Sequence, residues 1–227
     1  PLCRASPMAG YRLRTGLSFC RIDNRTLFLD LQADRYFGLS APLDTAFQTL
    51  LDTGGADPAL AILVEMDILI PNPEDRLPSP CPAASPGPIL PPPLEPHARP
   101  SLLAIAVAII TRAHWALRVR YCPLTANIDR LARRKDALAS GPRPTSATIA
   151  RLAEAHRRAG LILSARDQCL PTSMALMAAL TARGANPTLV LGVKLDPFQA
   201  HCWVELAGTV LNDAPDHVRP FTPIRRV

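Results

Sequence analysis

The sequence predicts an α+β protein made of two domains and a proline-rich linker. Residues 1–70 carry a strand-hairpin pattern followed by short helices, whereas residues 101–227 carry long helical patterns followed by strands. Residues 71–100 contain twelve prolines, three of them consecutive at 91–93. Such a segment packs poorly as helix or sheet and favours extended polyproline geometry. We therefore expect domains at 1–70 and 101–227, with a linker at 71–100.

In the front domain we expect a hairpin and two helices. Residues 17–22 and 27–31 are typical of strands, a turn is expected at 32–34, and residues 35–39 return as another strand. Pro42 suits the first turn of a helix that Gly54 ends. Pro58 opens a second helix, and its apolar residues Leu60, Leu63 and Val64 fall on an inward face.

In the back domain we expect helices first and strands last. The helices are at 102–134, broken at Pro123, at 148–158 before Gly160, and at 169–183 before Gly184. The strands are at 188–194, 200–206 and 209–212, with a tight turn at 207–208.

Charge is unevenly distributed over a formal net of +6. Residues 1–75 hold six Lys/Arg and ten Asp/Glu, a net of −4, and residues 101–160 hold eleven and three, a net of +8. A basic stretch can bind nucleic acid, but this one lacks interleaved aromatic residues. A solvated helix face is the better interpretation, and we expect no nucleic-acid partner.

The cysteines point to a reduced protein. The six cysteines form no CxxC pair and no Cys/His spacing typical of metal sites, so we expect no metal. The first residues do not read as a signal peptide, and the longest apolar run, 102–110, is nine residues, too short to cross a bilayer. We therefore expect a cytoplasmic location and no membrane contact.

Three residues of the back domain could form a catalytic triad. Cys169 stands where a helix begins, and there the unpaired N–H groups favour a thiolate and could hold an oxyanion. His201 lies in the following strand pair and Asp213 at its end, so imidazole and carboxylate can meet. A thiolate, a base and a group that orients the base are the parts of a nucleophilic site.

Other interpretations of the same residues stay open. A lone buried cysteine is usually a small apolar residue, and a lone histidine is usually structural. Asp216 is a rival for the third position, and Trp203 could line the site or fill the core. Cys202 is expected to pack away from His201, because neighbouring residues of a strand face opposite sides.

From about residue 165 onward the chain resembles the B proteins of lasso-peptide biosynthesis, which are cysteine proteases of the transglutaminase-like (papain-like) fold. The residues that carry the resemblance are CLPTSMAL at 169–176, LGV at 191–193, PF at 197–198, AHCWVE at 200–205 and ND at 212–213. The resemblance implies that Cys169 is the nucleophile, His201 the base and Asp213 the orienting group. Thr172 and Cys202 depart from the pattern, which expects a basic residue and an alanine.

The front half resembles a leader-recognition domain (a RiPP recognition element), a small winged-helix-like module that binds precursor peptides. The resemblance rests on residues 27–31 and 35–39 and on the helix at Pro42. The second arm of the hairpin has no obvious later strand to pair with, so we expect a leader to add as a strand beside it; the alternative is that the N-terminus or residues 68–70 cover this edge. The expected leader-binding residues are Arg35, Tyr36, Phe37, Leu39, Leu60, Leu63 and Val64.

Together the two resemblances imply a peptidase that removes the leader of a ribosomally made lasso-peptide precursor. An asparagine-synthetase-like macrolactam synthetase would then close the ring. No cofactor is expected in this chain, which lacks a GxxxxGK[ST] loop, so any ATP would act through the synthetase. The alternatives are an acyltransferase with the same triad and a non-catalytic protein that delivers the precursor.

Overall fold

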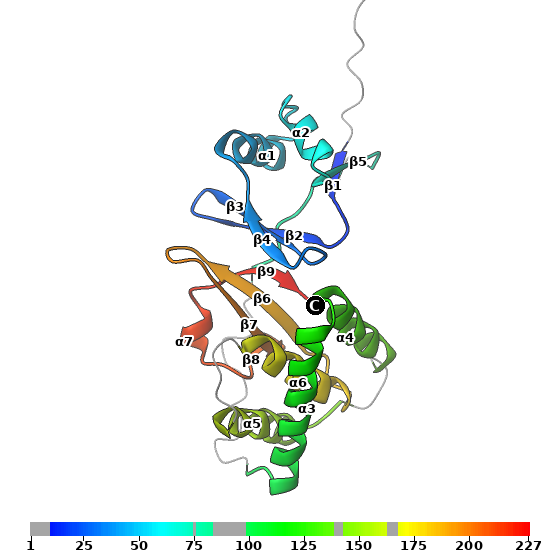
Figure 1. Ribbon diagram of the computed structural model, residues 1–227, viewed down its shortest axis with the longest axis vertical. Helices are drawn as coiled ribbons and strands as arrows, with labels where there is room; N and C mark the ends of the chain where they lie inside the picture. Colours follow the sequence, from blue (N-terminus) through cyan, green and yellow to red (C-terminus); the bar gives the residue numbers. More distant parts are fainter. Residues whose placement is uncertain (1–9, 75, 84–98, 139–142, 163–167) are drawn as a thin grey trace, which may run out of the picture. The chain divides into compact units, whose positions relative to one another are not determined.

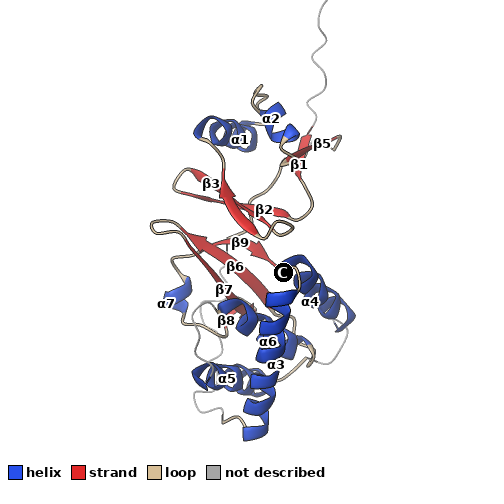
Figure 2. Cartoon of the chain, viewed as in Figure 1, coloured by secondary structure: helices blue, strands red, loops and turns tan. Residues whose placement is uncertain are grey.

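The computed structural model describes residues 10–74, 76–83, 99–138, 143–162 and 168–227. The chain divides into two compact units, Pro1–Pro82 and Ala83–Val227, and each is described here by itself. Both combine sheets with helices packed beside them (Figure 1; Figure 2), so the predicted α+β class is confirmed. The middle of the predicted linker, residues 84–98, lies outside the described residues.

The first unit is built around a three-stranded antiparallel sheet in the order β2-β3-β4. Its elements are β1 (Gly10–Leu13), β2 (Leu17–Ile22), β3 (Arg25–Asp30), β4 (Arg35–Gly38), α1 (Ala41–Thr53), α2 (Leu60–Glu65) and β5 (Leu69–Asn72). The predicted hairpin and the α1 boundaries are confirmed, with Pro42 in the first turn and Gly54 as a left-handed C-cap.

Three phenylalanines hold α1 on this sheet. The ring of Phe47 lies 5.2 Å from that of Phe19 and 5.3 Å from that of Phe28, and all three are fully buried. The carboxylate of Asp44 accepts a hydrogen bond from the backbone N–H of Thr26, which fastens α1 to β3. Aromatic contacts of this kind add to the free energy gained by burial.

The sequence gives no sign of β1 and β5, which pair with each other in antiparallel register. Pro71 and Asn72 belong to β5, so the first unit extends past residue 70. A proline is tolerated there because a two-stranded ribbon leaves one side of each strand without a partner that needs its N–H.

The second unit places helices beside a four-stranded antiparallel sheet in the order β8-β7-β6-β9. The elements are α3 (Leu102–Tyr121), α4 (Leu124–Leu138), α5 (Ser146–Ile162), α6 (Cys169–Thr181), β6 (Thr188–Lys194), β7 (Gln199–Leu206), β8 (Thr209–Val210), α7 (Pro215–Val218) and β9 (Thr222–Arg226). Helix α6 is central, because α3, α4, α5 and the strands β6 and β7 all pack against it (Figure 1).

The expected break at Pro123 is confirmed, but three expectations differ from the structure. Helix α5 continues through Gly160 to Ile162 instead of ending there. Strand β8 has only two residues. The C-terminal segment, for which the sequence predicts no element, supplies α7 and β9, and β9 pairs with β6.

Helix α3 is the one helix in the described parts with the length and apolar composition of a membrane span. The nine-residue apolar run at 102–110 forms the first half of this helix. One face of α3 buries Ala108, Arg112 and Trp115, and α3 packs on α5 and α6. Leu102 and Ile110 stay exposed, so packing within the second unit covers only part of the apolar surface of this helix.

Candidate active site

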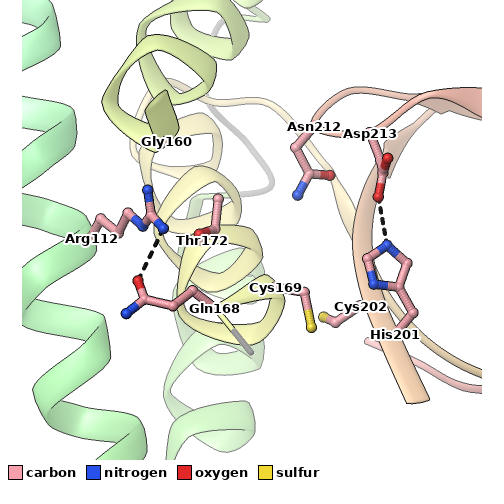
Figure 3. Close-up of a pocket in the computed structure, with 9 residues that line it drawn as sticks. All are labelled: Arg112, Gly160, Gln168, Cys169, Thr172, His201, Cys202, Asn212 and Asp213. Atoms are coloured by element: carbon pink, nitrogen blue, oxygen red, sulfur yellow. Dashed lines mark hydrogen bonds and ion pairs between the residues drawn. The ribbon is translucent and has the colours of Figure 1, made fainter. Parts of the chain in front are cut away.

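Helix α6 begins at Cys169, as the sequence predicts, and the half-buried thiol opens into a pocket of about 320 Å³. Pro171 occupies the first turn, where a missing N–H costs nothing. Arg112, Gly160, Gln168, Cys169, Thr172, His201, Cys202, Asn212 and Asp213 line the pocket (Figure 3). The three residues of the predicted triad therefore lie in one pocket, although they come from three separate segments.

His201 and Asp213 are directly hydrogen-bonded. Nε2 of His201 lies 2.5 Å from Oδ2 of Asp213, and both side chains are largely shielded from solvent. This leaves Nδ1 as the ring nitrogen available to Cys169, which also contacts His201. The arrangement places the imidazole between thiol and carboxylate, the order that a nucleophile–base–orienter triad requires.

The carboxylate and the thiol both favour a charged His201. The hydrogen bond to Asp213, followed by that to Cys169, raises the pKa of His201 to about 9 against the opposing effect of burial. Burial raises the pKa of Asp213, but hydrogen bonds from His201, His217 and the Ala214 N–H outweigh it and bring this pKa down to about 2. At neutral pH the site therefore holds an imidazolium beside an ionised carboxylate.

A buried network connects helix, strand and loop beneath the triad. Ser173 of α6 donates its hydroxyl to the Cys202 carbonyl at 2.9 Å and accepts from the Asn212 amide at 2.8 Å. The Asn212 side-chain oxygen in turn accepts from the Val204 N–H of β7 at 2.8 Å. Asp213 follows directly, so this network fixes where its carboxylate lies. The sequence predicts no role for Ser173, and it points to Asn212 only as part of the family pattern.

Aromatic rings surround the imidazole. Trp203 stacks near His201 with ring centroids 6.0 Å apart, and Phe221 lies 5.1 Å away. The Trp203 Nε1–H donates to Glu205 at 2.8 Å, and Glu205 is also paired with Arg226 of β9. Trp203 therefore both lines the site and fills the core, and its hydrogen bond to Glu205 holds the indole in place.

The sequence predicts no role for His217, which the structure places beside Asp213. Its Nδ1 lies 2.9 Å from Oδ1 of Asp213, and its ring centroid is 5.0 Å from that of His201. The four-residue spacing between Asp213 and His217 brings them together at the start of α7. That spacing is a signal in the sequence, but only once a helix is assigned to residues 215–218.

Arg112 is a second pocket residue that sequence reasoning missed. It is almost fully buried, donates from Nη2 to the Gln168 side chain at 3.0 Å and donates from Nη1 to the Ala159 carbonyl at 3.3 Å. Gln168 immediately precedes the thiol, so Arg112 helps to fix the entry to α6. A Cβ at Gly160 would lie 3.5 Å from Nη1, an ordinary van der Waals distance, so the guanidinium does not require glycine there.

The structure divides the expected leader-binding residues into two groups. Arg35, Tyr36 and Phe37 lie on β4, an edge strand of its sheet, and Leu39 follows it. None of the described strands pairs with the outer side of β4. Val64 is partly buried.

Leu60 and Leu63 are only 2% and 0% exposed and belong to the core, so the expectation that they face a ligand is wrong. They turn inward because α2 packs its apolar stripe on the core that Phe47 and Phe28 share. The exposed apolar residues of this segment are Ile62 and Met66 instead.

Comparison of the sequence with known proteins gives two matches. A sequence profile of the transglutaminase-like superfamily matches residues 108–226, which is more than half of the chain. A stretch of 51 residues is 45% identical to the Microcin J25-processing protein McjB of Escherichia coli. This stretch covers 22% of the chain and 24% of that protein. No solved structure matches significantly.

These two matches confirm the predicted resemblance to the B proteins of lasso-peptide biosynthesis. The superfamily match spans α4, α5, α6, the whole C-terminal sheet and most of α3, and so includes every residue of the pocket. The chain belongs to the transglutaminase-like superfamily.

Proposed function

We propose that this chain is a cysteine endopeptidase that removes the leader from a ribosomally made lasso-peptide precursor. The observation that carries the proposal is the single pocket in which Cys169, His201 and Asp213 meet. Similarity to a protein described as processing microcin J25 supports a peptide precursor as the substrate.

The chemistry follows from the placement of the three groups. The Cys169 thiolate attacks the carbonyl carbon of the scissile bond, and the resulting oxyanion is held by N–H groups at the start of α6. His201 gives the proton on Nδ1 to the leaving amine, which departs as the C–N bond breaks. The neutral ring then takes a proton from water, and the hydroxide attacks the acyl-enzyme, releasing the new carboxylate and restoring Cys169.

Asp213 keeps the imidazole in the tautomer and orientation that these steps need. Because its carboxylate stays ionised, it stabilises the imidazolium at each stage at which His201 holds two protons. No step needs a metal or an organic cofactor from this chain. ATP, where it is required, acts through the macrolactam synthetase that closes the ring.

The first unit would hold the leader while the second unit cuts. The open edge of β4 supplies backbone donors and acceptors for an added strand. The partners are then the precursor and the synthetase, with no nucleic acid and no membrane, and the location is the cytoplasm. Cys20, Cys122, Cys169 and Cys202 carry free thiols, in keeping with a reducing compartment.

Acyl transfer to an amine is the second candidate, because the superfamily is named for transglutaminases. The acyl-enzyme is common to both reactions, and only the group that attacks it differs. A protein that merely delivers the precursor is a third candidate.

Mass spectrometry of the precursor after incubation with this chain, its synthetase and ATP tests the proposal. We expect free leader and shortened core from the wild type, none from Cys169→Ala, and full activity from Cys122→Ala, which changes another half-buried thiol outside the pocket. An amide adduct would indicate a transferase, and an unchanged precursor a delivery protein. Full cleavage by Cys169→Ala would contradict the proposed nucleophile.

A further inference from the structure

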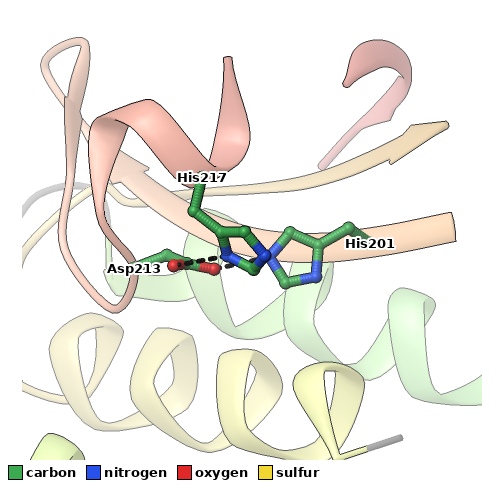
Figure 4. Close-up of side chains that lie close together, drawn as sticks. All are labelled: His201, Asp213 and His217. Carbon is green, nitrogen blue, oxygen red and sulfur yellow. Dashed lines mark hydrogen bonds and ion pairs between the residues drawn. The ribbon is translucent and has the colours of Figure 1, made fainter. Parts of the chain in front are cut away.

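The carboxylate of Asp213 links two imidazole rings through its two oxygens. Oδ2 pairs with Nε2 of His201, and Oδ1 lies 2.9 Å from Nδ1 of His217. These three side chains offer one ligand atom each, and the three atoms lie within 4.8 Å of one another (Figure 4). The His217 side chain is 62% exposed, so this cluster is open to solvent on one side.

Two imidazole nitrogens and a carboxylate oxygen form a common zinc ligand set, with a fourth position left to water. Bonds of about 2.0–2.2 Å to one ion require ligand atoms roughly 3–4 Å apart. The present separations, from 2.5 Å for the closest pair to at most 4.8 Å, bracket that range. The exposed His217 can complete the geometry by rotating its side chain.

We propose that His201, Asp213 and His217 form a zinc site that inhibits the enzyme, with the ion replacing the protons that now lie between the rings and the carboxylate. The binding of zinc stands independently of the reaction, whereas its inhibitory effect rests on the proposed peptidase function.

Inhibition follows from proton balance on His201. With zinc on Nε2, the neutral ring holds its one proton on Nδ1, toward Cys169. Any proton previously on Nε2 has been released to solvent. The ring can no longer accept a proton from the thiol or carry the two protons of an imidazolium, and so it loses its acid–base role.

This site is distinct from the thiol–imidazole pair. A metal bound between Cys169 and His201 would use Nδ1, on the opposite side of the ring from Asp213. His217 would then be irrelevant to binding. The dependence on His217 therefore separates the two possibilities.

Isothermal titration of zinc chloride into the full-length Cys169→Ala chain measures the proposed site without the thiol. We expect one ion bound with micromolar or better affinity. Adding His217→Ala should weaken this binding at least tenfold. Adding His217→Asn should weaken it similarly, while the amide still donates to Asp213 and preserves the fold. His114→Ala, which removes an exposed histidine of α3, is the matched control and should leave the affinity unchanged.

Two results would overturn the site: equal zinc affinity with and without His217, or binding that appears only when Cys169 is restored. Inhibition is tested separately, by cleavage of the precursor at increasing zinc and its reversal by EDTA. Zinc binding without inhibition would overturn the inhibitory role. Zinc binding to a chain that never cleaves the precursor would refute the peptidase function and leave the metal site standing.

Discussion

Asp213 accepts three hydrogen bonds, and their distribution defines its role. Oδ1 receives the Ala214 N–H at 2.7 Å and faces His217, while Oδ2 faces His201. The contacts on Oδ1 hold the plane of the carboxylate, so that Oδ2 faces the imidazole of His201. A group that orients another must itself be oriented, and here backbone and side chain share that task.

Replacing this carboxylate should therefore damage catalysis far more than replacing its neighbour. We expect Asp213→Asn to lower kcat by at least about 100-fold, because the amide cannot stabilise the imidazolium and favours the wrong tautomer. Asp216→Asn should change kcat by less than about twofold, since Asp216 is exposed on α7 and surface changes are usually mild. Steady-state cleavage kinetics measure both, and a reversed order would reject Asp213 as the third triad member.

The same contacts make stability depend on pH. The pKa of His201 is raised from 6.5 to about 9. Its contribution to the free energy of unfolding is therefore complete below pH 6.5 and is lost as pH rises through about 9. Because the pKa of Asp213 is lowered to about 2, its contribution is complete above pH 3.8 and is lost as pH falls through about 2. The pKa shifts of His201 and Asp213 both report the hydrogen bond between them, so its contribution to stability is counted only once. The His201 shift is larger because Cys169 adds to it.

Urea unfolding of the wild type and of Asp213→Asn should show this dependence. We expect the difference in unfolding free energy to be roughly 3 kcal/mol at most near pH 6 and to shrink steadily toward pH 10. Asp216→Asn should show no such trend. A difference that grows with pH would mean that His201 is not held charged by Asp213.

At the residue scale the sequence predicts the proposed catalytic groups but not the residues that hold them in place. Cys169, His201 and Asp213 can be proposed from the sequence because each type has a chemical role at that point of the pattern. Arg112 and Ser173 cannot, because their partners Gln168 and Cys202 become neighbours only when separate elements pack together.

At the element scale, the packing between β6 and β7 depends on a close contact between Gly192 and the ring of Trp203. A Cβ built on Gly192 would lie 2.6 Å from two ring atoms of Trp203 and 3.1 Å from the Phe221 Cβ. The indole is also held from behind by Glu205, which is paired with Arg226. The absence of a side chain at Gly192 therefore decides where the Trp203 ring, and with it the wall beside His201, can lie.

Gly192→Ala should destabilise the protein by about 1–3 kcal/mol, the usual range for overpacking a core, and should lower kcat by displacing Trp203. The smaller ring in Trp203→Phe should relieve part of the clash. We therefore expect Gly192→Ala to lower the free energy of unfolding less in a Trp203→Phe background than in the wild type. Thermal unfolding of the four proteins measures the coupling, and strictly additive effects would show that the predicted contact does not exist.

Elements with strong local signals are predictable from this sequence. Proline and glycine mark the ends of α1, proline marks the break between α3 and α4, and alternation marks β3. The strands β1, β5 and β9 are short, and their partners are distant in sequence, so no local pattern identifies them. Gly160 misleads because a glycine can also lie inside a helix, and α5 continues through it to Ile162.

On the scale of the whole molecule, the two units have separate cores. The aromatic cluster around Phe28 holds the first unit, and the packing of α6 on its sheet holds the second. The first unit includes β5 and extends to Pro82, where the Cys81 N–H still bonds to the Phe19 carbonyl. A fragment that ends at residue 70 would cut through β5, whereas one that ends at residue 82 keeps it.

We expect residues 1–82 alone to bind the leader peptide. No described strand pairs with the outer edge of β4, so an extended segment can add there, and Ile62 and Met66 offer exposed apolar surface on α2 and directly after it. Backbone pairing supplies affinity with little choice of sequence, so apolar side chains of the leader must supply selectivity. Calorimetry should give micromolar or tighter binding, and amide NMR shifts should concentrate on Arg35–Gly38 and around α2.

The matched variant Met66→Asp leaves the core intact, because Met66 is 52% exposed, and should weaken leader binding about tenfold if apolar contact contributes ~1.4 kcal/mol. Glu65→Ala, an exposed change on the same segment, is its control and should have little effect. Binding by residues 83–227 with none by residues 1–82 would reject the edge of β4 as the leader site. The first unit would then serve to dock the synthetase, and precursor choice would lie in the pocket around Cys169 and Thr172.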